Sequence, residues 1–133
     1  MDWNEFEKET RKLANMIDYK PDMIVGIARG GVIPATLLAK MLEVADVYII
    51  KMHRDGNERL ISADIFTDID KKNILLVEDM IETGKSLIAG KKFLEERGAS
   101  VRTACLYTMP MSEIQPDYFL RQENRIAQFP WNG

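Results

Sequence analysis

Glu78 and Asp79 stand next to each other, directly after the apolar run at residues 73–77. Two adjacent carboxylates at the end of a buried strand repel each other unless another group satisfies them. The hydroxyls of a sugar diol would donate hydrogen bonds to such a pair, and Mg²⁺ with its waters would neutralise it. Since an isolated acidic pair in a loop is more often simply hydrated, the neighbouring residues decide its role.

Residues 82–86, Glu-Thr-Gly-Lys-Ser, have the composition of a phosphate-binding loop at the start of a helix. Free N–H groups at a helix start carry partial positive charge and favour a phosphate. Gly84 lets the backbone approach a ligand closely, and the two hydroxyls and the lysine of this loop add donors and charge. The alternative is an ordinary capped helix with Thr83 as its N-cap. A phosphate loop beside two carboxylates favours a ribose phosphate as the ligand.

Arg29, Gly30 and Gly31 form a second unusual loop, which also joins an apolar run to a predicted helix. An arginine with two glycines suits an anion that is held by the guanidinium and by backbone N–H groups. The alternative is a plain turn with a surface arginine. Two anion sites and a diol site at the ends of strands of one sheet suggest a ligand with phosphates at both ends of a ribose.

Two common nucleotide-binding motifs are absent from the sequence. A P-loop, GxxxxGK[ST], needs a glycine where Asp79 stands. The dinucleotide fingerprint GxGxxG is not matched either, because residues 26–31 read Gly-Ile-Ala-Arg-Gly-Gly. We therefore exclude a P-loop kinase or NTPase.

The hydrophobic pattern predicts strands that alternate with helices. Helices are expected at residues 3–17, 32–42 and 87–97, and strands at 22–28, 44–52, 61–66, 73–77, 101–108 and 125–129. Residues 53–60 read as a polar, turn-forming segment. Because the central strands are apolar on both faces, we expect an α/β fold with a largely parallel sheet flanked by helices. Such sheets bind ligands at the carboxyl ends of their strands, where both unusual loops lie.

Composition sets the broad class. The chain has 133 residues, one cysteine, one histidine and a net charge of −3, with 18 basic and 21 acidic side chains. These numbers favour a single domain over residues 1–133 and exclude a disulfide or a cysteine- or histidine-based metal site. The charge gives no sign of a nucleic-acid partner. No apolar run is long enough to span a membrane and no signal peptide is visible, so we expect a cytoplasmic protein.

The segment Leu75–Leu87, an apolar strand, two acids, a spacer and Thr-Gly-Lys-Ser, resembles the phosphoribosyl pyrophosphate (PRPP) signature of type I phosphoribosyltransferases. The loop Ile27–Pro34 resembles the pyrophosphate loop of the xanthine-guanine branch, and Phe129-Pro130-Trp131 resembles the C-terminal end of that branch. The resemblance covers nearly the whole chain. It implies the type I phosphoribosyltransferase fold, with a short mobile loop at 53–61 and a small C-terminal hood.

The resemblance also implies roles for individual residues. Arg29, Gly30 and Arg59 would bind pyrophosphate, with the Ala28–Arg29 peptide in the cis form. Glu78 and Asp79 would bind the ribose hydroxyls, with Asp79 nearest to Mg²⁺. The 5′-phosphate would be held by the loop Glu82, Thr83, Gly84, Lys85 and Ser86. Glu82 and Asp79 are the candidate catalytic residues, because Glu82 would exchange a proton with the base. The base itself would meet Glu82, Ile126 and Ala127.

The implied function is transfer of the phosphoribosyl group from PRPP to a purine-like base, with guanine, xanthine and hypoxanthine preferred. The resemblance implies a Mg²⁺-dependent enzyme of nucleotide salvage. It also implies a homodimer or homotetramer. Three features depart from the family pattern. Glu82 replaces the usual aspartate, Thr108 or Met109 stands where 6-oxopurine enzymes carry a lysine, and Ile126 takes a normally aromatic position. These departures keep open an alternative, a non-catalytic sensor of PRPP or nucleotides on the same fold.

Overall fold

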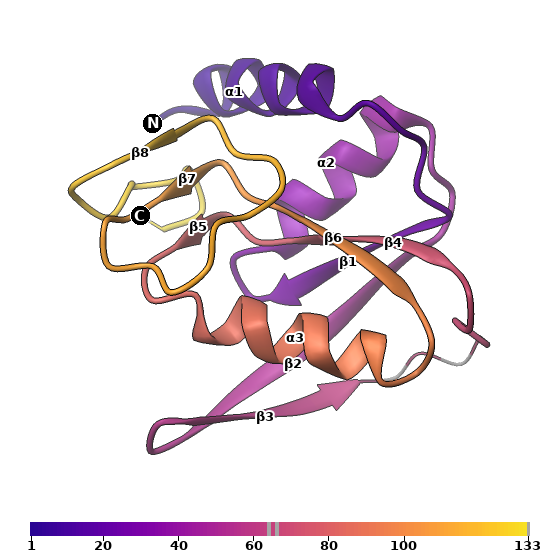
Figure 1. Cartoon of the computed structure of the whole chain (residues 1–133). Helices are drawn as coiled ribbons and strands as arrows, with labels where there is room; N and C mark the ends of the chain where they lie inside the picture. The colour runs from indigo at the N-terminus through magenta and orange to yellow at the C-terminus, as the bar shows by residue number, and fades with distance from the viewer. Residues whose placement is uncertain (64, 66, 133) are drawn as a thin grey trace.

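The computed structural model describes residues 1–63, 65 and 67–132 of the chain. A five-stranded sheet with the order β3-β2-β1-β4-β6 lies between two layers of helices (Figure 1). Its strands are β1 (Met23–Ala28), β2 (Val47–Asp55), β3 (Glu58–Ala63), β4 (Asn73–Val77) and β6 (Ser100–Ala104). All neighbours pair in parallel except β2 and β3. The predicted α/β class with a largely parallel sheet is therefore confirmed.

Each face of the sheet packs against helices because alternate side chains of the central strands point to opposite sides. Leu75 and Val77 of β4 join the core beneath α1 (Trp3–Met16) and α2 (Val32–Leu42). Ile74 and Leu76 of the same strand join the core beneath α3 (Lys85–Glu95). A strand buried on both faces cannot alternate apolar and polar residues, which explains the continuous apolar run in the sequence.

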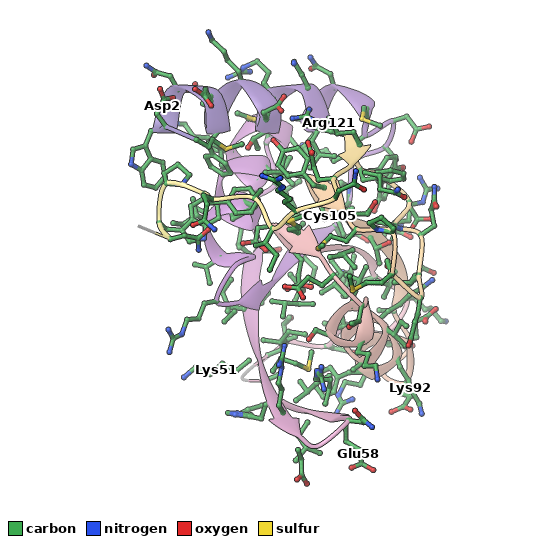
Figure 2. The ribbon with its side chains drawn as sticks, turned by 90° about the vertical axis from the view of Figure 1, so that its left-hand side faces the viewer. Asp2, Lys51, Glu58, Lys92, Cys105 and Arg121 are labelled. Atoms are coloured by element: carbon green, nitrogen blue, oxygen red, sulfur yellow. The ribbon has the colours of Figure 1, made fainter. Side chains whose placement is uncertain are left out.

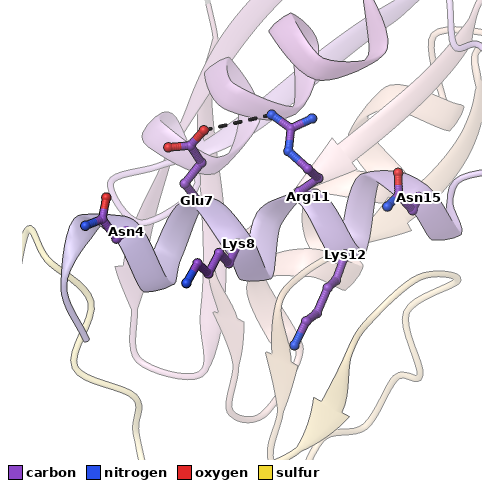
Figure 3. A pocket seen from close by; sticks show the side chains of 6 residues that line it. All are labelled: Asn4, Glu7, Lys8, Arg11, Lys12 and Asn15. Carbon is purple, nitrogen blue, oxygen red and sulfur yellow. Dashed lines mark ion pairs between the residues drawn. The ribbon is translucent and has the colours of Figure 1, made fainter.

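Helix α1 is amphipathic and covers one edge of the core. The Asp2 carboxylate caps its first turn by accepting from the Glu5 N–H at 2.8 Å. Its outer face carries the polar residues drawn in Figure 3, among them the ion pair of Glu7 and Arg11 at 3.9 Å. This shallow polar surface comes from one helix alone and lies outside the candidate site. Among the described residues, no helix combines the length and the apolar character that crossing a membrane requires.

The sequence suggested a polar, turn-forming segment at residues 53–60, but the structure has regular strands there. Strands β2 and β3 run through it as an antiparallel hairpin that closes at Gly56, where φ is +62°. The side chains are polar here because the hairpin extends beyond the helices. Of the strand expected at 61–66, residues 61–63 belong to β3, and residues 64 and 66 lie outside the described residues.

Other predicted boundaries also shift. The strand expected from residue 44 begins at Val47, and the helix expected at 87–97 runs from Lys85 to Glu95. The single strand expected at 101–108 divides into β6 and the short β7 (Tyr107–Thr108). It divides because the intervening backbone turns to other partners, with the Leu106 N–H donating to the Asp79 carbonyl at 2.9 Å.

A second, small sheet with the order β5-β7-β8 forms the C-terminal hood, together with the tail to residue 132. Its other strands are β5 (Met80–Ile81) and β8 (Arg121–Gln122). The strand expected at 125–129 was wrong: the last strand lies at 121–122. The tail is held by side-chain packing and not by backbone pairing with a neighbouring strand. The Phe129 ring stacks between Tyr107 and Trp131, with ring centroids 6.0 Å and 4.9 Å away.

Buried polar contacts fasten the hood to α1. The Glu9 carboxylate accepts from the Tyr107 hydroxyl at 2.8 Å and pairs with Arg121 at 2.7 Å. Burial and the Glu9 hydrogen bond raise the pKa of Tyr107 far above its usual range. The hood is therefore fixed above the end of the sheet at which β1 and β4 finish (Figure 1).

Candidate active site

The acidic pair lies where β4 leaves the main sheet. The Glu78 N–H donates to the Ala104 carbonyl at 3.0 Å, and β5 begins at Met80. The Asp79 carboxylate accepts from the Met80 N–H at 2.6 Å. The backbone on both sides of the pair is thus fixed by the two sheets, which holds both carboxyl groups at the carboxyl end of β4.

Burial and mutual repulsion disfavour the charged forms of this pair. Burial, and to a lesser extent the neighbouring Asp79, raises the pKa of Glu78 to about 8. Burial also raises the pKa of Asp79, against the opposing hydrogen bonds from Met80 and Trp131. A carboxyl group held in this way gains its charge readily when hydroxyl donors or a cation arrive.

The raised pKa of Glu78 predicts that the ligand-free fold loses stability as the pH rises. The folded protein holds this proton more tightly than the unfolded chain, whose glutamate has a pKa near 4.5, so stability is lost between about pH 4.5 and 8. Urea unfolding in EDTA at pH 5, 6.5 and 8 would measure it. Glu78→Gln should flatten the profile, whereas parallel profiles for the two proteins would contradict the prediction.

The loop at residues 82–86 follows β5 and starts α3. Gly84 is the N-cap residue, with φ +85°, so the predicted alternative of Thr83 as N-cap was wrong. A Cβ on Gly84 would lie 2.6 Å from the Ile114 side chain, and the Glu113 N–H donates to the Thr83 carbonyl at 2.7 Å. The 112–114 segment therefore supports this loop from behind and requires glycine at its centre.

The loop at residues 28–31 meets the acidic pair directly. The Ala28–Arg29 peptide is cis, as the resemblance implied. A Cβ on Gly30 would lie 2.5 Å from a carboxylate oxygen of Asp79, and a Cβ on Gly31 would collide with the Val77 carbonyl. Both glycines are thus required by the close approach of two loops that are nearly fifty residues apart in the sequence.

A cleft of about 370 Å³ opens in front of the loop at residues 82–86. Of the predicted site residues, its lining includes Arg59, Glu78, Glu82, Thr83, Gly84, Lys85 and Ser86. Sequence reasoning missed three further lining residues, Arg54, Asn57 and Met80. The alternation Ile50, Met52, Arg54 could have revealed Arg54 as a residue on the inner face of a strand. Arg29 is exposed. The remaining predicted site residues lie outside the described lining of this cleft: Arg29, Gly30, Asp79, Ile126 and Ala127.

The segment predicted to meet the base runs beside the cleft. The Ala127 N–H donates to the Met80 sulfur at 3.2 Å, which brings this backbone to a lining residue. Ile126 is 55% exposed and therefore accessible to a ligand. Thr108 and Met109 are buried in and just after β7.

The donor set at Glu78 and Asp79 fits Mg²⁺, which prefers oxygen ligands and usually keeps several waters. The raised pKa values of both groups show that the fold leaves their charge largely uncompensated. In residues 1–63, 65 and 67–132, no group of three or more His, Cys, Asp or Glu side chains could hold a metal alone. A cation here would therefore share its coordination with ligand oxygens and water.

Comparisons of the sequence and of the structure with known proteins all point to phosphoribosyltransferases. The model of the phosphoribosyl transferase domain matches residues 2–132. A xanthine-guanine phosphoribosyltransferase of Chromohalobacter salexigens is 28% identical over 98% of this chain and 81% of its own length. The crystal structure of a purine phosphoribosyltransferase from Pyrococcus horikoshii superposes with a TM-score of 0.89 and 31% identity, covering 98% of this chain and 91% of that one.

One relative is much longer than this chain. A ribose-phosphate pyrophosphokinase of Parasynechococcus marenigrum is 31% identical over 78% of this chain, but the match covers only 31% of its own length. The match thus covers only one part of the pyrophosphokinase, but most of the two phosphoribosyltransferases.

Proposed function

This chain belongs to the phosphoribosyl transferase domain family, and on that premise we propose that it transfers the 5-phosphoribosyl group of PRPP to a purine-like base and releases pyrophosphate. The observation that carries the proposal is the cleft that joins Glu78, the first residue of the acidic pair, to the phosphate loop at 82–86. Guanine, xanthine and hypoxanthine are the preferred bases in this proposal, which is supported by the names of the purine enzymes that match nearly the whole chain.

In this proposal, the loop at 82–86 binds the 5′-phosphate with its backbone N–H groups, its hydroxyls and Lys85. Glu78 and Asp79 accept hydrogen bonds from the two ribose hydroxyls, which fixes the orientation of the sugar. Arg29 and Arg59 bind the pyrophosphate at the other end of the ribose. The ligand is thus held at both its 5′-phosphate and its pyrophosphate while the bond at the anomeric carbon changes.

The reaction replaces the bond from the sugar anomeric carbon to pyrophosphate with a bond to a base nitrogen. Glu82 exchanges the proton of the purine imidazole and favours the positive charge that develops on the sugar. Mg²⁺, held by Asp79 together with Glu78, would neutralise charge on the departing pyrophosphate. The backbone at Ile126 and Ala127 contacts the base.

Arg29→Ala is expected to weaken binding of PRPP more than binding of a nucleoside monophosphate. The reason is that Arg29 follows β1, at a different strand end from residues 82–86, and the monophosphate has no pyrophosphate. Loss of a charged hydrogen bond corresponds to about 1.5–3 kcal/mol. Calorimetry with both ligands would check this, and equal losses for the two would contradict the assignment.

Copies of the chain are also proposed to associate as a homodimer or homotetramer. Trp3 is 56% exposed and borders an apolar groove between α1 and α2, together with Ile33 and Leu37. Contiguous exposed apolar surface of this kind is typical of association sites. Light scattering should give the mass of two or four chains, whereas a monomer at micromolar concentration would contradict the proposal.

A competition experiment tests the reaction itself. PRPP, Mg²⁺ and an equimolar mixture of guanine, xanthine, hypoxanthine, adenine, uracil and orotate are incubated with the protein, and the nucleotides formed are separated by chromatography. We expect a 6-oxopurine nucleotide to dominate. A pyrimidine nucleotide as the main product would overturn the base assignment while leaving the transfer reaction intact.

A further inference from the structure

The two carboxyl groups of the acidic pair have different surroundings. Glu78 lines the cleft together with the loop at residues 82–86, whereas Asp79 lies outside the described lining. The Asp79 carboxylate lies instead against Gly30, where a Cβ would approach one of its oxygens to 2.5 Å. Its other oxygen accepts from the Met80 N–H at 2.6 Å. The orientation of Asp79 therefore depends on contacts that the phosphate loop does not supply.

A tight turn in the C-terminal tail brings an aromatic side chain to this carboxylate. The Asn132 N–H donates to the Phe129 carbonyl at 3.0 Å, and the Phe129 N–H donates to the Asn132 side chain at 2.8 Å. Pro130 takes the second position of the turn, where its fixed φ is favourable. Trp131 takes the third position, and its side chain donates a hydrogen bond to Asp79. The indole N–H is the only donor of a tryptophan side chain, so this contact has a defined direction.

Aromatic packing fixes the position of Trp131. Its ring stacks on Phe129 and meets Phe6 of α1 edge-on, with the ring centroids 4.9 Å apart in both pairs. Figure 2 shows the C-terminal tail, drawn in yellow, below α1 near Asp2. The indole is thus held by the tail on one side and by α1 on the other. A rotation that takes its N–H away from Asp79 would disturb both ring contacts.

The hydrogen bonds to Asp79 leave part of its accepting capacity for a ligand. An ionised carboxylate can accept about four hydrogen bonds. The N–H groups of Met80 and Trp131 take two of these positions, and the others remain for a ribose hydroxyl or a cation. Partners that hold a ligating carboxylate from behind fix its direction, and their loss typically weakens binding roughly 10–100-fold. Trp131 has this place relative to Asp79, since it too lies outside the described lining of the cleft.

We propose that Trp131 is a positioning residue, whose indole N–H holds the Asp79 carboxylate in the orientation that receives PRPP. The proposal rests on the proposed function of the acidic pair and adds to it a residue of the C-terminal turn. Trp131 acts through Asp79 and does not itself touch the ligand. The segment Phe129-Pro130-Trp131 thereby has a role in the site as well as in the packing of the hood.

A double-mutant cycle tests the coupling between the two residues. Calorimetry would measure the affinity for Mg·PRPP of the wild-type protein, Trp131→Phe, Asp79→Asn and the double variant. Phenylalanine keeps an aromatic ring in the turn and removes the N–H, so Trp131→Phe should lower the affinity about tenfold. In the Asp79→Asn background the same change should cost about threefold or less, because a hydrogen bond to an uncharged oxygen is about half as strong. In the background of Asp46→Asn, an exposed control, it should again cost about tenfold.

Nuclear magnetic resonance gives a direct signature of the contact. The chain has two tryptophans, so two indole N–H signals are expected, and Trp131→Phe identifies the one that belongs to Trp131. Asp79→Asn should move the Trp131 signal to lower chemical shift and speed the exchange of its proton, while the Trp3 signal stays nearly in place. Asp46→Asn should move neither signal. This measurement needs no ligand and keeps Trp131 intact, so it decides the contact even if Trp131→Phe fails to fold.

The outcomes separate the role of Trp131 from the proposed function. If the wild-type protein binds Mg·PRPP but Trp131→Phe costs nothing, or costs as much in the Asp79→Asn background as in the wild type, the positioning role is overturned and the function stands. An unmoved Trp131 signal in Asp79→Asn would show that the hydrogen bond does not form, which also overturns the role. If the wild-type protein does not bind Mg·PRPP, both the proposed function and the role of Trp131 are overturned.

Discussion

Replacing Glu82 by glutamine is expected to lower turnover by roughly 10²–10⁴-fold, the usual contribution of a positioned general acid or base. Glu82 is exposed, lines the cleft and is the first residue of the loop proposed to hold the 5′-phosphate. Its side chain is therefore available to a base that is joined to the same sugar. PRPP affinity should change little, because the proposed phosphate contacts come from residues 83–86.

Steady-state kinetics with the best base would measure this, alongside calorimetry of PRPP binding. Glu95→Gln is a matched control, because it makes the same change at the exposed far end of α3. It should leave both turnover and PRPP affinity unchanged. A Glu82→Gln protein that keeps at least a third of the wild-type turnover would refute the catalytic role and leave Glu82 as an ordinary residue at a helix start.

Asp79→Asn should weaken the binding of Mg·PRPP by about 1–3 kcal/mol, because a charged hydrogen bond is lost while the shape is kept. Asp46→Asn, on an exposed side chain before β2 at the opposite end of the parallel strands, should have no such effect. Calorimetry on the three proteins would decide. Unchanged affinity in Asp79→Asn would remove this residue from the site.

Gly30→Ala tests the same site without replacing a charged residue. The added Cβ would lie 2.5 Å from the Asp79 carboxylate, so either the acid or the 28–31 loop must move. We expect PRPP affinity to fall at least as far as in Asp79→Asn. Retention of wild-type affinity would mean that the contact between the two loops has no part in binding.

The central strands and both unusual loops were predictable from the sequence. Strand β4 (Asn73–Val77) was predictable because its last four residues are all apolar. A strand that is buried on both faces has such a continuous apolar run. The loops were recognised because glycine, hydroxyl and charged residues follow such strands. Their chemistry is local in the chain, so reading it needed no knowledge of long-range contacts.

The hairpin and the hood could not be predicted in the same way. Residues 53–60 are polar because they extend past the helices, and local propensity cannot separate such a hairpin from a loop. The tail at 125–129 has an apolar pattern because Phe129 stacks between Tyr107 and Trp131, not because it adds a strand. The position of the tail depends on contacts between distant segments, whereas the hairpin pairs residues that are close in the sequence but carry no hydrophobic alternation at its polar end.

Phosphoribosyl transfer is tested by the rate of pyrophosphate release from PRPP by the wild-type protein, with Mg²⁺, in the presence and absence of a base. We expect rapid release that requires guanine, xanthine or hypoxanthine and yields one nucleoside monophosphate per pyrophosphate. PRPP binding without release for any base would contradict it, and would identify the chain as a sensor of PRPP on the same fold.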